Sequence, residues 1–365
     1  MTGLLPEGFH DRLPPAADAA ARLEGRVLGV ARLYGYEQVD PPLAEFADEL
    51  ATRLKAGGLR DAVRFVDPVS QRTLAIRPDL TAQVGRIAAT RMGHHPRPLR
   101  LSYAGAVMKL SASELNPQRS MRQIGCELIG LDTVAAATEI VRVAIEALQA
   151  AGVTGLAVDF TLPDLTDTLA GESLDGETLA LLRERLDAKD AGGVAAIDPR
   201  YLPLIEAAGP FDAAMARLRA IDAGKALGSR LDRLAEIAAS IKGQAALTLD
   251  PTERHGFEYQ TWLGFSIFST GIRGEIGRGG SYTIVHDGGR EEPAVGFSLF
   301  ADPILDTGVG ADARRRLFLP LGTPAALGAR LRGEGWVTVA ALEADDTPEA
   351  QLCSHVWQDG VAQQL

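Results

Sequence analysis

The chain has 365 residues, of which 46% are apolar, and it carries 37 basic against 48 acidic side chains for a net charge of −11. That length supports a substantial core, so we expect one large domain and a smaller one. The longest apolar run falls far short of the roughly 20 residues of a membrane helix, and the acidic balance disfavours the basic face that nucleic-acid binding requires. Cys126 and Cys353 show no metal-ligand spacing, and the first residues lack the regions of a signal peptide, so we expect a cytoplasmic protein without disulfides, metals or cofactors.

Helix and strand signals alternate along the first half of the chain. An alanine-rich amphipathic stretch from 16 to 34 follows two prolines and is closed by Gly35, which predicts a helix with a glycine stop. After it we expect a short strand at 36–42, β-rich segments at 62–80 and 99–130, a helix at about 135–152 and a strand at 156–162.

From about 164 to 241, Ala, Leu, Arg and Asp at helical spacing predict a helical insertion between strands. Strand signals then run from 248 to about 300, with the glycines of 271–280 predicting a turn. The tail is expected to hold a strand at 317–320, a helix at 324–334, a strand at 336–342 and a final helix. The pattern therefore favours an α+β fold with a core at 1–308 and a short C-terminal α/β module at 309–365.

The segment 121–128 carries the first candidate binding residues. Side chains alternate between the two faces of a strand, so Gln123, Gly125 and Glu127 share one face while the apolar residues between them face the core. The glycine leaves room for a ligand between a carboxamide and a carboxylate. A solvated strand face explains the same pattern equally well.

Asp79 and Thr81 repeat this geometry, because Pro78 favours an extended backbone before it and the carboxylate and hydroxyl then project together. With Gln123 they could accept three hydrogen bonds from an ammonium group, and Glu127 could accept another from an imidazole N–H. Taken alone, the Pro-Asp-Leu-Thr segment is equally plausible as a helix N-cap.

These segments, in their order and spacing, resemble the catalytic core of histidyl-tRNA synthetase, a class II enzyme, over residues 1 to about 308. The resemblance rests on the opening, class II motifs 1 and 2, and a glycine-rich strand region, which correspond to residues 5–14, 36–41, 103–127, 277–281 and 294–299. It implies a class II antiparallel sheet flanked by helices.

The resemblance also implies the roles of individual residues. In the family an acidic residue, a Thr and a Gln hold the substrate's amino group and a Glu contacts its imidazole, matching the four residues named above. The family's histidine-specific segment Arg-Gly-Leu-Asp-Tyr-Tyr corresponds to His255–Gln260, so His255 and Tyr259 would belong to the same vestigial histidine pocket. Because an arginine has become His255, the carboxylate end of the pocket departs from the family, although Arg254 lies beside it.

Three positions expected to serve ATP are altered relative to the synthetases. Their motif 2 carries Phe-Arg-x-Glu where this chain has Met108-Lys109-Leu110-Ser111, and the motif 3 arginine corresponds to Pro303. Lysine keeps the charge but loses the bidentate fork, and proline offers neither charge nor N–H. Losing one donor to developing phosphate charge typically costs on the order of 2.7–4 kcal/mol. We therefore expect no useful adenylation.

A synthetase-like core with a broken ATP site, and a chain that ends before a complete anticodon-binding domain, is similar to the regulatory subunits of ATP phosphoribosyltransferase. That resemblance implies a non-catalytic subunit that joins a short catalytic subunit in a hetero-octamer for the first step of histidine biosynthesis. It further implies self-association through the class II dimer interface and feedback inhibition by L-histidine, with tRNA and membranes not expected as partners. A subunit interface is an alternative place for histidine.

Other functions are compatible with the same residues. An active or degenerate histidyl-tRNA synthetase would use Lys109 with Arg254 or Arg278, and a stand-alone amino-acid ligase or nucleic-acid-binding regulator is a further alternative. Gly277–Ser281 could cradle a phosphate, although glycine-rich turns between strands are common.

Overall fold

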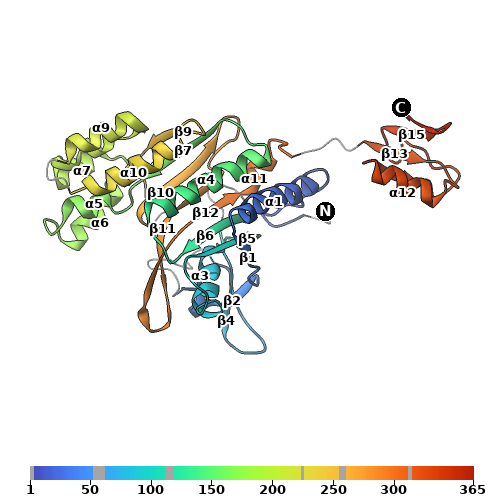
Figure 1. Cartoon of the computed structure of the whole chain (residues 1–365). Helices are drawn as coiled ribbons and strands as arrows, with labels where there is room; N and C mark the ends of the chain where they lie inside the picture. The colour runs from blue at the N-terminus through green and yellow to red at the C-terminus, as the bar shows by residue number, and fades with distance from the viewer. Residues whose placement is uncertain (1–3, 52–61, 112–117, 223–225, 255–259, 311–314) are drawn as a thin grey trace. The chain divides into compact units, whose positions relative to one another are not determined.

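The computed structural model describes residues 4–51, 62–111, 118–222, 226–254, 260–310 and 315–365 (Figure 1). It divides the chain into two compact units, Met1–Gly310 and Ala311–Leu365. Two predicted pocket residues, His255 and Tyr259, lie outside the described residues. None of the described helices combines the length and apolarity needed to cross a membrane.

The first unit is built on a nine-stranded sheet. From one edge to the other its strands are β1 (Glu37–Gln38), β5 (Leu99–Met108), β6 (Ser120–Ile129), β12 (Glu291–Phe300), β11 (Gly277–Val285), β10 (Gln260–Ser269), β7 (Leu156–Thr161), β9 (Ala246–Leu249) and β8 (Gly209–Pro210). Neighbours pair antiparallel except β1 with β5 and β7 with β9. The antiparallel-rich sheet agrees with the fold class expected from the sequence.

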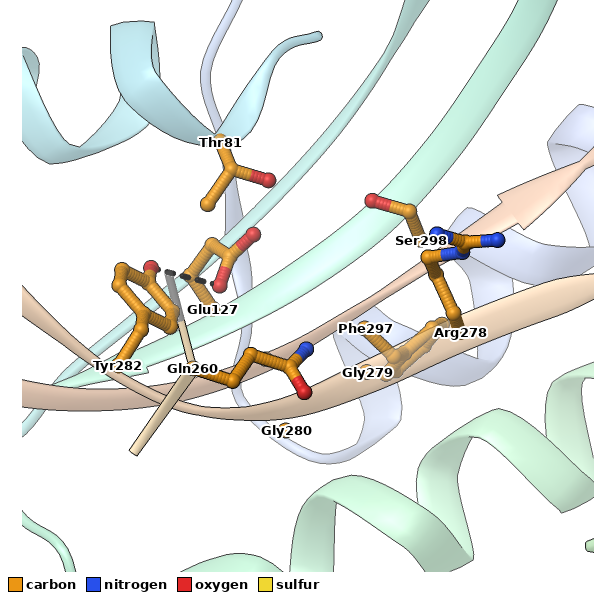
Figure 2. A pocket seen from close by; sticks show the side chains of 10 residues that line it. Thr81, Glu127, Gln260, Arg278, Gly279, Gly280, Tyr282, Phe297 and Ser298 are labelled. Atoms are coloured by element: carbon orange, nitrogen blue, oxygen red, sulfur yellow. Dashed lines mark hydrogen bonds between the residues drawn. The ribbon is translucent and has the colours of Figure 1, made fainter. Parts of the chain in front are cut away.

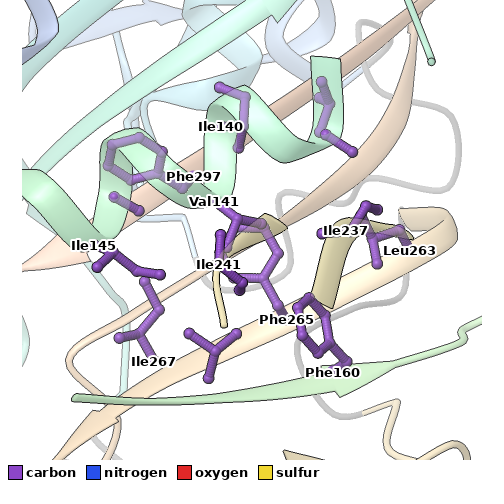
Figure 3. Close-up of a cluster of buried hydrophobic side chains, with 14 of the residues drawn as sticks. Ile140, Val141, Ile145, Phe160, Ile237, Ile241, Leu263, Phe265, Ile267 and Phe297 are labelled. Atoms are coloured by element: carbon purple, nitrogen blue, oxygen red, sulfur yellow. The ribbon is translucent and has the colours of Figure 1, made fainter. Parts of the chain in front are cut away.

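Helices α1 (Ala16–Leu33) and α4 (Val134–Ala151) pack together across one face of the sheet (Figure 1). Figure 3 shows α4 residues Ile140 and Ile145 in one cluster with Phe265 and Phe297 of the strands. The predicted glycine stop is confirmed, because Gly35 adopts the left-handed conformation after α1 with φ of 84°.

Helix α3 (Thr81–Thr90) packs on the opposite face of the sheet, where Leu80, Val84 and Ala88 join a second apolar cluster. Arg97 links its C-terminal end to the sheet, because this side chain donates to the carbonyl oxygen of Ala88 at 3.3 Å and to Glu292 of β12 at 2.6 Å. Beside α3 lies a small sheet of β2 (Ala44–Phe46), β4 (Thr73–Ile76) and β3 (Arg64–Val66). The short helix α2 (Ala47–Ala51) directly follows β2. The sheet is therefore covered on both faces around its central strands.

The segment between β7 and β9 is mainly helical. Its described helices are α5 (Leu165–Ala170), α6 (Gly176–Asp187), α7 (Ala191–Ile197), the 3₁₀ helix η1 (Pro199–Tyr201), α8 (Pro203–Glu206), α9 (Phe211–Ile221) and α10 (Gly228–Ser240). A second 3₁₀ turn, η2 (Asp287–Gly289), joins β11 to β12, and α11 (Ala301–Leu305) follows β12.

The second unit contains a four-stranded sheet in the order β14 (Val337–Ala340), β13 (Arg316–Leu319), β15 (His355–Gln358), β16 (Val361–Gln364), with helix α12 (Ala325–Gly333). The prediction of a final helix is wrong, because β15 and β16 form an antiparallel hairpin. Asp359 and Gly360 both adopt positive φ, 52° and 81°, as a two-residue type I′ turn requires, and Asp-Gly is a typical sequence for that turn.

Candidate functional site

The candidate site lies on the α3 face of the sheet, where β6, β12 and β11 run side by side. Glu127 of β6 pairs with Gly296 of β12, and Gly296 pairs with Gly280 of β11. Directly paired residues present their side chains on the same face. One carboxylate and two glycines therefore form a row across three strands.

The predicted alternation along β6 is confirmed. Ile124, Cys126 and Leu128 join the core cluster that includes α4, while Gln123 and Glu127 occupy the other face. Both polar residues are only 1% exposed, so the alternative of a solvated strand face is wrong. Buried polar groups need hydrogen-bond partners, and both residues have them.

Two tyrosines hold the Glu127 carboxyl group. Tyr103 donates its hydroxyl to Oε1 at 2.9 Å. Tyr282 donates to Oε2 at 2.7 Å, as Figure 2 shows. Burial raises the pKa of Glu127 to about 8, although the two tyrosine hydrogen bonds oppose that rise. The group is therefore a strong hydrogen-bond acceptor when ionised, at a position fixed from two sides.

Gln123 and Asp79 bind each other behind this carboxylate. The Gln123 amide donates to Asp79 at 2.8 Å and to the hydroxyl of Ser298 at 2.6 Å, and it accepts from the backbone N–H of Leu80 at 2.9 Å. Asp79 also accepts from the backbone N–H of Thr81 at 2.6 Å, at the start of α3. The helix-start and binding-site readings of Asp79 are thus compatible.

A small pocket opens beside Glu127 (Figure 2). Thr81 and Glu127 line it, whereas Asp79 and Gln123 are not among its described lining residues. The other lining residues are Gln260, Arg278, Gly279, Gly280, Tyr282, Gly296, Phe297 and Ser298.

The turn predicted from the glycines of 271–280 is confirmed at its beginning, where Gly271 and Gly274 have positive φ. The glycines of 277–280 instead belong to strand β11. A Cβ at Gly296 would overlap the Glu127 carboxylate, and one at Gly280 would lie 2.5 Å from Oε1 of Gln260. The glycines therefore make room for polar side chains that reach over the strands.

The three altered ATP positions do not line this pocket. Lys109 is exposed at the end of β5, where its backbone N–H donates to Arg119 at 2.8 Å. Ser111 is also exposed, and Pro303 is partly buried within α11. The first turn of a helix tolerates proline because N–H groups there need no helical partner.

The two candidate replacement arginines differ in position. Arg254 donates to the carbonyl oxygen of Pro163 at 3.1 Å and lies 3.9 Å from Asp167, away from the described pocket lining. Arg278 lines the pocket and forms an ion pair with Glu275. Of these two arginines, Arg278 is the one placed to meet a ligand.

Several residues of the site were not predicted from the sequence. Tyr103, Tyr282 and Ser298 bind the predicted residues directly, and Gln260 lines the pocket. They lie on four strands, so only the strand pairing reveals that they share one face. Among the described residues, no group of three or more His, Cys, Asp or Glu is arranged to hold a metal ion.

Comparisons with known proteins agree with this geometry. A family model described as histidyl-tRNA synthetase matches residues 8–304. The fold is similar to that of histidyl-tRNA synthetase from Nostoc sp. PCC 7120, with a TM-score of 0.79 at 14% identity over 98% of this chain and 91% of that one. A Bacillus halodurans protein described as an ATP phosphoribosyltransferase regulatory subunit/histidyl-tRNA synthetase gives a TM-score of 0.80 at 20% identity, covering 96% of both chains. The fold and site thus define a class II, histidyl-tRNA synthetase-like protein.

Sequence relatives narrow this class. The chain is 43% identical to the ATP phosphoribosyltransferase regulatory subunit of Rhodospirillum centenum, over 99% of this chain and 96% of the relative. It is 42% identical to the protein of the same name from Paramagnetospirillum magneticum, over 99% and 97%. The chain belongs to the family of ATP phosphoribosyltransferase regulatory subunits.

Proposed function

We propose that this chain is the non-catalytic regulatory subunit of ATP phosphoribosyltransferase in the cytoplasm. It joins a short catalytic subunit in a hetero-octamer, self-associates through the class II dimer interface, and makes the first step of histidine biosynthesis sensitive to histidine. The observation that carries the proposal is the buried acceptor Glu127, fixed by two tyrosines beside a small pocket, in a chain with altered ATP positions. The names of its relatives support the regulatory role.

Histidine fits this pocket chemically. Its imidazole N–H would donate to Glu127, and its ammonium group would bind near Thr81, Asp79 and Gln123, replacing part of the Asp79–Gln123 contact of 2.8 Å. Charge-assisted hydrogen bonds of this kind are the stronger ones in proteins. The resemblance to the synthetases assigns His255 and Tyr259 to the same pocket, although both lie outside the described residues.

We do not expect this chain to catalyse adenylation. Lys109 is exposed rather than directed into the described pocket, and α11 carries Pro303 where the family has an arginine. Without the arginines of motifs 2 and 3, the developing phosphate charge would lack two of the cations that the synthetases position there.

The decisive experiment is co-purification with a short catalytic subunit, followed by a phosphoribosyltransferase assay with and without histidine. We expect an active complex that histidine inhibits. Glu127→Ala should leave an active complex that histidine no longer inhibits, whereas Glu236→Ala, at an exposed position on α10, should behave as wild type. Failure to associate, or inhibition unchanged in Glu127→Ala, would contradict the proposal. Histidine-dependent pyrophosphate exchange by the chain alone would favour the synthetase alternative.

A further inference from the structure

Arg278 gives the pocket a cation at some distance from Glu127. This residue of β11 lines the pocket beside Ser298 of β12, its direct cross-strand partner (Figure 2). It lies two residues before Gly280, which belongs to the same row of paired residues as Glu127. Two residues along a strand span about 6.6 Å and share one face, so the acceptor and the cation are separated by about the length of one small amino acid.

A cation at this place suits the carboxylate of an amino acid. Arginine can donate two parallel N–H groups to a carboxylate, which is one of the stronger contacts in proteins. The synthetase residue that is expected to bind the substrate's carboxylate corresponds to His255, outside the described residues. A histidine with its imidazole on Glu127 and its ammonium group near Thr81 would have its carboxylate free to reach Arg278.

Glu275 already occupies this cation. Its carboxylate accepts from Nε of Arg278 at 3.0 and 3.1 Å and from a terminal guanidinium nitrogen, and it also accepts from the hydroxyl of Ser266 at 2.6 Å. Glu275 precedes β11, in the turn that contains Gly271 and Gly274, and is not among the described lining residues of the pocket. From outside the pocket it therefore takes up N–H groups that a ligand's carboxylate would need.

An internal carboxylate and a ligand's carboxylate make the same contacts with a guanidinium group, so the two compete. The apparent affinity of a ligand falls with the fraction of molecules whose site is free to bind it. Both side chains of the pair are partly exposed, 26% for Arg278 and 19% for Glu275, and such pairs are weak enough to be exchanged. Because Glu275 lies in a turn, no strand pairing has to break when it leaves.

We propose that Arg278 is a specificity-determining residue that binds the ligand's carboxylate, and that Glu275 is an internal competitor for it. Binding of an amino acid then exchanges one carboxylate for another on the same guanidinium group. This inference rests on the proposed histidine site and gives it a carboxylate contact at a different position from that of the synthetases. An imidazole ligand without a carboxylate binds without the exchange.

The test compares histidine with histamine, which lacks the carboxylate, by calorimetry on the full chain. Wild type should bind histamine at least about tenfold more weakly than histidine, the size of one lost hydrogen bond to a charged group. Arg278→Ala should bind histidine as weakly as wild type binds histamine, and its affinity for histamine should equal that of wild type.

Glu275→Gln should act in the opposite direction. Removal of the competitor should tighten histidine binding by about two- to fivefold and leave histamine binding unchanged. A residue that only supports the fold would not give such a gain. In the Arg278→Ala background the same substitution should have no effect on histidine binding, because the cation for which the carboxylates compete is gone.

A distant ion pair supplies matched controls. Arg219 of α9 donates to Asp232 of α10 at 2.7 Å, and both side chains are exposed. Arg219→Ala and Asp232→Asn should bind histidine and histamine as wild type does. Glu275→Gln changes a polar side chain in a turn, so it tests the inference even where Arg278→Ala does not fold.

The outcomes distinguish this inference from the proposed function. If wild type binds neither histidine nor histamine, both are overturned. If wild type binds the two ligands equally, or if Glu275→Gln shows no gain, the inference alone is overturned. A gain that persists in the Arg278→Ala background would also overturn it, because Glu275 would then act by repelling the ligand's carboxylate directly.

Discussion

At the scale of single residues, Glu127 makes the stability of the protein depend on pH. Burial raises the pKa of this carboxyl to about 8, whereas a glutamate in an unfolded chain titrates near about 4.3. Between these values the folded state holds a proton that the unfolded state has released. The free energy of unfolding therefore falls as pH rises through this window, by at most about 1.4 kcal/mol per pH unit, and levels off above pH 8.

Glu127→Gln should remove this dependence, because an amide of the same shape does not titrate. Its free energy of unfolding, measured by urea denaturation at several pH values, should rise relative to wild type from pH 5 to 8 and then stay level. The control Glu236→Gln should follow the wild-type curve. A constant offset between Glu127→Gln and wild type across this range would contradict the assignment.

Residues of the site could be predicted from the sequence only where a single segment carries the whole pattern, with polar and apolar side chains alternating along one strand. Gln123 and Glu127 were recognised together because they lie four positions apart on a single strand whose opposite face is apolar. Tyr282 and Gln260 were not predicted, because they belong to β11 and β10 and lie more than 130 residues from Glu127 in the chain. Strand register places them beside Glu127, and register is set by tertiary packing.

At the scale of elements, the β15–β16 hairpin depends on its turn. Gly360 has φ of 81°, a conformation that costs an L-residue with a side chain roughly 1–2 kcal/mol. Gly360→Ala should therefore lower the stability of the second unit by about that amount, as followed by fluorescence of Trp357 during denaturation. Gly333→Ala, at the end of α12 with no atom near the added Cβ, should be neutral or stabilising. Equal effects of the two substitutions would contradict the turn assignment.

Local sequence patterns predict some elements correctly and mislead at others. Helices α1 and α4 were predicted correctly because apolar periodicity and a following glycine agree. The glycines of β11 were expected to form a turn, since Gly commonly marks turns. They belong to a strand because side chains from neighbouring strands occupy the space that a Cβ would take, as Gln260 does over Gly280.

At the scale of the whole molecule, the proposed regulation requires coupling between the proposed histidine site and the catalytic subunit. Such coupling is commonly about 1–3 kcal/mol and is reciprocal, so the partner must change histidine affinity by the same factor by which histidine changes partner affinity. Calorimetry of histidine binding with and without the catalytic subunit should show a change of about 5- to 150-fold. Identical affinities would rule out regulation through this pocket.

The order of strands across the main sheet could not be read from the sequence pattern. The neighbouring strands β6 and β12 join segments more than 160 residues apart, and no local signal specifies such a pairing. The fold class could be predicted only because the order of the motifs resembles a known family. That each long helical segment is a helix, by contrast, could be predicted from its apolar periodicity alone.

Helix α3 is fastened to the sheet at both ends, through Gln123 at its start and through the Arg97–Glu292 ion pair after its last turn. A displacement of its first turn would therefore act on β6 through Gln123 and on β12 through Glu292. Packed elements that move together as a rigid body are one way in which subunits of an assembly alter one another across an interface.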